Sequence, residues 1–170
     1  MGGTPGEAAP GARQRFDLPG VDAFTAPYWR AAAAGRLLIR RCGAEGCGAA
    51  HHYPREFCPH CWSEDVDWEE ADGRATLYTW SVVHRNDLPP FDTRVPYVAA
   101  VVELAEGPRM MTEITGCPPE SLRVGMELRV AFRRAGGTEA EAEEGARERE
   151  RGSPPEPVVP VFRPAPGRRG

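Results

Sequence analysis

The stretch that decides the fold is CGAEGCGAAHHYPREFCPHC, residues 42–61, which holds four of the five cysteines of the chain. Four residues separate Cys42 from Cys47, two separate Cys58 from Cys61, and ten lie between the pairs. Two cysteine pairs on tight turns can bring four thiolates to the corners of a tetrahedron, which is the geometry that Zn²⁺ prefers. The pattern therefore predicts a zinc ribbon with these four cysteines as ligands.

Other chemistries of these cysteines need consideration. A thioredoxin-like redox role for a CxxC pair requires a βαβ context, which the strand-rich surroundings do not provide. An iron site with four sulfur ligands stays open, because softness and geometry suit both metals. Four thiolates leave a metal no open position for water, so we expect a structural site with one metal ion per chain.

The residues around the cysteines have expected roles as well. Three histidines could replace a thiolate, but we expect each to lie at the surface: His51, His52 and His60. Phe57 and Trp62 flank the second pair and are expected to pack the ribbon against its neighbours. Cys117 has no partner in the sequence and is expected to be a small buried or turn residue.

The segment before the cysteines predicts one helix. Residues 1–20 are rich in glycine, proline and alanine and are expected to form a disordered arm. Residues 21–35 follow as a helix, with Pro27 in the first turn and Gly35 as the stop signal. The aromatic residues Tyr28 and Trp29 on this helix could pack within the chain or form a partner surface. The ribbon is expected over 36–68, with a strand at 37–41.

The segment after the cysteines is mainly β. Strands are expected at 74–84, 97–104, 109–115, 127–133 and 158–162, with a helical turn before the fourth. Five short strands suit a small barrel, and an OB-fold barrel is the natural candidate over 69–164. The charged stretch 134–157 has no aliphatic side chain larger than alanine and is expected to be an acidic loop insertion, and 165–170 a tail.

Composition excludes several function classes. All 21 basic residues are arginine, so no lysine can form a Schiff base or bind phosphate in a P-loop. The formal net charge of −4 provides no overall positive field for nucleic acid. No apolar run is long enough for a membrane span, and the N-terminus lacks the apolar core of a signal peptide. We therefore expect a cytoplasmic location.

Three features carry a resemblance to a known family: the cysteine pairs, the barrel strands and the closing segment PVFRP. On these features, residues 24–164 resemble the family called domain of unknown function 35, in which a rubredoxin-like zinc ribbon is joined to an OB-fold. The acidic insertion and the wide first cysteine pair depart from the family pattern. The resemblance implies a non-catalytic accessory subunit of an acyl-CoA enzyme, in lipid or steroid side-chain metabolism. The implied partners are thiolase-like condensing enzymes, lipid-transfer-type aldolases or MaoC-type hydratases, which supply the catalytic residues and share an acyl-CoA site.

Candidate contacts to acyl-CoA or to the partner lie on the helix, on one strand and on the loop that follows it. They are Tyr28, Trp29, Trp80, Arg85, Phe91, Arg94 and Tyr97. Arginines in this loop could bind CoA phosphates bidentately. An ordinary solvated loop would have the same composition.

Two other functions fit individual features of the sequence. OB-folds also bind single-stranded nucleic acid, and Tyr78 and Trp80 could stack on bases. The negative net charge argues against this alternative. A self-sufficient enzyme could use His84 and Glu103 for acid–base chemistry, but nothing in the sequence pairs them.

Overall fold

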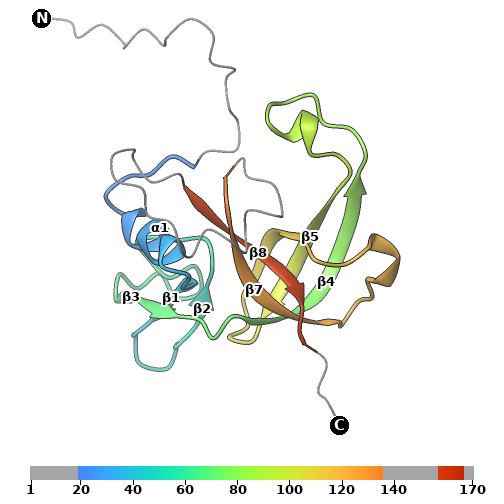
Figure 1. Cartoon of the computed structure of the whole chain (residues 1–170). Helices are drawn as coiled ribbons and strands as arrows, with labels where there is room; N and C mark the ends of the chain where they lie inside the picture. Colours follow the sequence, from blue (N-terminus) through green and yellow to red (C-terminus); the bar gives the residue numbers. More distant parts are fainter. Residues whose placement is uncertain (1–18, 136–156, 167–170) are drawn as a thin grey trace, which may run out of the picture.

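The computed structural model describes residues 19–135 and 157–166 of the 170-residue chain. Within these ranges a single α-helix precedes two systems of strands, a three-stranded antiparallel sheet and a closed barrel (Figure 1). Most of the expected arm, nearly all of the acidic insertion and most of the tail lie outside the described residues. The mainly β fold with an N-terminal helix, a ribbon and a five-stranded barrel is confirmed.

The helix α1 (Ala26–Ala33) is shorter than the predicted 21–35. Asp22 and Thr25 form a turn ahead of it, in which the backbone N–H of Thr25 donates to the Asp22 carboxylate at 2.7 Å. Pro27 lies in the first turn, as predicted, and Gly35 has a φ of +75°, which suits the end of a helix. The residues before Ala26 therefore form a turn that starts the helix and are not part of it.

The ribbon sheet has the order β2-β1-β3, with β1 (Leu38–Cys42) between β2 (Ala50–His51) and β3 (Val66–Glu70). The outer strands were not predicted, because β2 has only two residues and β3 is rich in acidic residues. Tertiary contacts hold β3 in place: Arg41 donates to both carboxylate oxygens of Glu69 at 2.8 and 2.7 Å, and the Arg40 guanidinium lies 4.8 Å from the Trp68 ring centre.

The barrel contains all five predicted strands, with ends shifted by two residues or fewer. They are β4 (Arg74–Val83), β5 (Tyr97–Leu104), β6 (Arg109–Ile114), β7 (Glu127–Arg134) and β8 (Val158–Pro164). Their order is β4-β5-β6-β8-β7, β7 pairs with β4 to close the barrel, and the β6–β8 contact is parallel. Short 3₁₀ turns lie in two connections, η1 (Phe91–Thr93) and η2 (Pro119–Ser121).

A bulge interrupts β4, and one further hydrogen bond extends the β7–β8 ladder. A bulge in β4 between Leu77 and Thr79 interrupts the pairing with β5 and leaves Tyr78 46% exposed. At the end of the β7–β8 ladder, Ala135 donates its backbone N–H to the carbonyl of Pro157 at 2.7 Å. The pairing between the two strands thus continues up to Ala135 and Pro157, the residues that flank the undescribed range 136–156.

One hydrophobic core joins the ribbon to the barrel. Leu37 and Ile39 from the ribbon side belong to the same buried cluster as Leu77, Val102 and Phe162 from the barrel, and all five are at most 2% exposed. Burial of side chains of this size contributes about 1.5–3 kcal/mol each. The shared core fixes the ribbon at the end of the barrel where the β5–β6 turn lies, next to the start of β4.

Candidate metal centre, loop and pocket

The four ribbon cysteines converge on one point. Their Sγ atoms all lie within 4.8 Å of one another, with Cys42–Cys61 at 3.6 Å and Cys47–Cys58 at 3.8 Å. A tetrahedral site with Zn–S bonds of ~2.3 Å has sulfur–sulfur edges of about 3.8 Å, whereas a disulfide requires ~2.05 Å. The predicted ligand set therefore has the geometry of a single four-thiolate metal site.

The local backbone explains how two short turns bring these sulfurs together. The residue after the second cysteine of each pair has a left-handed backbone, with φ of +60° at Gly48 and +64° at Trp62. Gly43 lies so close to Asp65 that a Cβ there would be 2.6 Å from a carboxylate oxygen. Among the described residues, Trp62 is the one non-glycine residue with a positive φ.

The environment of the sulfurs separates their pKa values. Burial raises the pKa of Cys42 to about 12. Burial would also raise the pKa of Cys58, but backbone N–H groups of Cys61 and His60 bring it to about 7. A metal bound by these cysteines would deprotonate its thiol ligands. A metal held by the four cysteines would stabilise a segment whose own core is small.

Two expectations about the residues near the metal centre were wrong. His51 and His52 are 7% and 8% exposed, so they are buried, while His60 is exposed as expected. Phe57 and Trp62 belong to neither of the buried hydrophobic clusters of the described residues. Their rings stack on each other at 5.4 Å and are 36% and 72% exposed. The left-handed turn at Trp62 belongs to the backbone turn of the second cysteine pair. The Trp62 ring lies on the solvent side of that turn.

The structure places the candidate contact residues in different surroundings. Tyr28 is 6% exposed and packs edge-on against Trp29, so it faces the chain's own core. Trp29 and Trp80 are partly buried against the same core. Arg85 is 85% exposed and pairs with Asp87 at 3.2 Å. Of these residues, Arg85 is therefore the most accessible.

The loop between β4 and β5 is tied to the barrel by an ion cluster that the sequence did not indicate. Arg94 donates to both oxygens of Glu113 at 2.8 and 2.6 Å, and Arg133 donates to the same carboxylate at 3.0 Å. Their side chains are 14%, 16% and 7% exposed. The Arg94 guanidinium also lies 5.7 Å from the Phe91 ring and 6.0 Å from the Tyr97 ring. Arg94 thus brings Phe91 and Tyr97 together in the β4–β5 loop. This loop projects from the barrel (Figure 1).

The acid–base pair considered for an enzyme is not assembled. His84 is exposed just after the end of β4, whereas Glu103 pairs with Thr76 near the start of that strand. At ~3.3 Å per residue, the two lie roughly 25 Å apart. Glu103 instead pairs with Arg109 at 2.9 Å, and the Arg109 guanidinium covers the Tyr78 ring at 3.6 Å.

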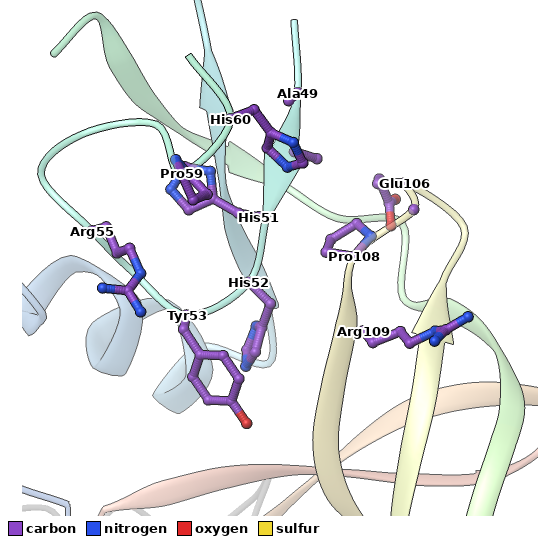
Figure 2. Close-up of a pocket in the computed structure, with 12 residues that line it drawn as sticks. Ala49, His51, His52, Tyr53, Arg55, Pro59, His60, Glu106, Pro108 and Arg109 are labelled. Carbon is purple, nitrogen blue, oxygen red and sulfur yellow. The ribbon is translucent and has the colours of Figure 1, made fainter. Parts of the chain in front are cut away.

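A pocket of about 500 Å³ lies between the ribbon and the β5–β6 turn. Figure 2 shows the ribbon residues on one side of it, and Glu106, Pro108 and Arg109 on the other. The buried His51 and His52 line this pocket. Because its walls come from two regions of the chain that meet only in the fold, periodicity and spacing gave no signal for it.

Comparison with known proteins follows the same division of the chain. A family model described as the rubredoxin-like zinc ribbon domain of ChsH2 matches residues 29–67, and one described as the C-terminal OB-fold domain of ChsH2 matches residues 68–133. A solved structure titled "Ltp2-ChsH2(DUF35) aldolase" has a chain that is 34% identical, with a TM-score of 0.65. The match covers 86% of this chain and 98% of that chain.

Two curated relatives are also similar. A DUF35 domain-containing scaffold protein of Methanocaldococcus jannaschii is 36% identical over 118 residues, which cover 66% of this chain and 79% of the relative. A probable enoyl-CoA hydratase alpha subunit of Thermomonospora curvata is 35% identical over 147 residues, which cover 86% of this chain and 39% of the relative. The chain thus spans well under half of the hydratase subunit. In the described residues, we find no helix with the length and apolar character needed to cross a membrane.

Proposed function

Because this chain belongs to the DUF35 family, in which a rubredoxin-like zinc ribbon precedes an OB-fold, we propose that it is a non-catalytic subunit of an acyl-CoA-processing enzyme. The match to nearly the whole DUF35 chain of a solved aldolase is the observation that supports this most directly. The relatives named as a scaffold protein and as a hydratase alpha subunit support a role within a larger assembly. The metal centre agrees, because four protein ligands leave no open position for catalysis.

The partner in this proposal is a hydratase, a lipid-transfer-type aldolase or a thiolase-like condensing enzyme. It supplies the catalytic residues, and the present chain stabilises it and helps to shape its acyl-CoA site. The acyl group belongs to lipid or steroid side-chain metabolism. The hydratase and aldolase relatives support the first two of these partner classes.

The surface that we propose for the partner is the β4–β5 loop and its base. Arg85 and Leu88 are exposed there, at 85% of the side chain and 48% of the residue. Phe91 and Tyr97 lie beneath them, held by the Arg94–Glu113 ion pair. A loop with exposed apolar and polar side chains on a fixed base loses little entropy on binding, which favours a specific interface. Trp29 and Trp80 are further proposed contacts, whereas the buried Tyr28 packs against Trp29 and the ribbon residues His52 and Trp68.

Co-expression tests the proposal. The chain is produced together with a candidate hydratase-, aldolase- or thiolase-like protein from the same genome, and we expect a stable complex with one of them on size-exclusion chromatography. Leu88→Asp should weaken the complex without changing the melting temperature. Val21→Asp, a matched change at a residue 55% exposed before the helix, should leave the complex intact.

The opposite result is equally clear. A chain that stays monomeric with each candidate, and that binds oligonucleotides with a steep salt dependence, would be a single-stranded nucleic-acid binder. That outcome would overturn the accessory-subunit proposal.

A further inference from the structure

The connection between β2 and β3 carries an exposed aromatic pair beside the second cysteine pair. The rings of Phe57 and Trp62 stack at 5.4 Å with an interplanar angle of 22°, and the two residues are 36% and 72% exposed. We call these two rings the aromatic platform. It belongs to the ribbon, whereas the proposed partner loop between β4 and β5 projects from the barrel well away from the ribbon sheet (Figure 1).

The first cysteine pair shows what the turn at Trp62 requires. Gly48 and Trp62 each follow the second cysteine of a pair, with φ of +60° and +64°. Glycine adopts this left-handed conformation without strain, whereas a bulky tryptophan is poorly suited to it. A glycine would therefore serve the second turn as it serves the first, and the Trp62 ring belongs to neither buried cluster. Strained backbone of this kind clusters at functional sites.

Carboxylates flank the aromatic platform. Glu56 directly precedes Phe57, Glu64 lies two residues after Trp62, and both glutamates are exposed. Neither of them forms an ion pair with another described residue. Arg55 is the one basic residue in the range 42–73, so the surroundings are acidic and disfavour phosphate groups. An aromatic ring beside free carboxylates complements a cation that has a flat apolar face.

The barrel holds a complete example of such a contact. The Arg109 guanidinium lies 3.6 Å from the centre of the Tyr78 ring and donates from Nε to Glu103 at 2.9 Å. The aromatic platform offers the same two elements, the Trp62 ring and the nearby Glu64, but no arginine of the described residues lies over that ring. We propose that the platform docks an arginine side chain of a partner protein, with the guanidinium flat on Trp62 and donating to a flanking carboxylate.

Arginine fits this surface better than lysine. Its guanidinium is planar and weakly hydrated, so it stacks on a ring while its N–H groups bind carboxylates. The stack with Phe57 restricts the Trp62 ring, so little side-chain freedom is lost on docking. The docking does not depend on the β4–β5 loop or on the class of the partner. Failure of arginine docking and failure of the accessory-subunit proposal are therefore distinguishable.

Calorimetric titration of the zinc-loaded full chain with hexa-arginine and hexa-lysine peptides at low ionic strength tests the proposal. We expect hexa-arginine to bind more tightly, because the two peptides carry equal charge and only guanidinium groups stack flat. Trp62→Gly should weaken hexa-arginine binding about 2- to 30-fold, the loss of one cation–π contact, and should narrow the difference between the peptides. Trp62→Phe keeps a ring and should bind nearly like wild type.

Trp62→Gly also separates docking from folding. Glycine suits the left-handed turn, so the variant should keep its zinc and should melt no lower than wild type. Val124→Ala changes a residue that is 71% exposed outside the ribbon, and it should leave peptide binding unchanged.

Several results would overturn the proposal. One is a lower melting temperature or loss of zinc in Trp62→Gly, which would show that the ring serves the fold. Another is equal hexa-arginine affinity of wild type and Trp62→Gly, or no saturation at millimolar peptide. A third is binding of single-stranded oligonucleotides that is lost in Trp62→Gly, which would assign the ring to base stacking.

Discussion

Replacing Glu113 by glutamine should destabilise the barrel strongly, because this carboxylate neutralises two guanidinium groups that are almost out of water. Arg94 and Arg133 are 14% and 7% exposed, and both donate to Glu113 at 3.0 Å or less. Glutamine keeps the shape but leaves two buried cations beside each other. Removing one partner from a buried pair costs about 3–5 kcal/mol, and the residual exposure here favours the lower end, about 3 kcal/mol. For a chain of this length that corresponds to a melting temperature roughly 6–12 °C lower.

Urea unfolding followed by tryptophan fluorescence measures this change, with an m value equal to that of wild type as the sign of an unchanged fold. The matched control is Glu103→Gln, which breaks a pair with Arg109 in which the side chains are 44% and 50% exposed. We expect no measurable shift for the control. High salt should leave the Glu113 effect in place, since buried pairs are weakly screened. A loss below about 1 kcal/mol for Glu113→Gln would show that the cluster is solvated and that this reasoning is wrong.

Three further changes test other regions of the structure. Gly73→Ala should cost about 1–3 kcal/mol, because its φ is +79° and a Cβ there would lie 2.5 Å from Val130. Metal analysis should find about one zinc per chain, and Cys58→Ser should abolish metal binding together with the ribbon's protection from hydrogen exchange. His52 has a folded pKa of about 4, below its ordinary 6.5. The wild type should therefore lose about 3 kcal/mol, relative to His52→Phe, as the pH falls from 6.5 to 4.

Each of these has a clear contrary result. Gly107→Ala, where φ is +104° and the space is open, serves as the control for Gly73→Ala, and equal losses would show that the Val130 contact is unimportant. Metal-free protein with a protected ribbon would contradict the zinc assignment. A constant stability difference between wild type and His52→Phe over this pH range would show that folding does not lower the pKa of His52.

The sequence was sufficient for the elements of the fold that rest on local pattern. Cysteine spacing predicted the ligands of the metal centre, because the geometry of the ion dictates the separation. Alternation of apolar residues predicted the barrel strands, and β5 at Tyr97–Leu104 was predicted to the residue. These signals are local, so tertiary packing did not need to be known.

Features that depend on tertiary contacts were missed. Strand β3 contains an aspartate and two glutamates, and its pairing depends on Arg41 and Trp68 contacts that no local pattern shows. His51 and His52 looked like surface residues because polarity predicts exposure, and only the meeting of ribbon and barrel buries them. Glu113 gave no signal because its partners Arg94 and Arg133 come from distant segments.

The closure of the β7–β8 ladder by the Ala135–Pro157 hydrogen bond makes this edge of the molecule a natural attachment point. The chain leaves and re-enters the barrel at adjacent positions. The entropic cost of a longer connection grows slowly, by about 0.6 kcal/mol for each doubling. A fluorescent reporter or an affinity module could be inserted here, which would allow the assembly to be followed in living cells without touching either terminus.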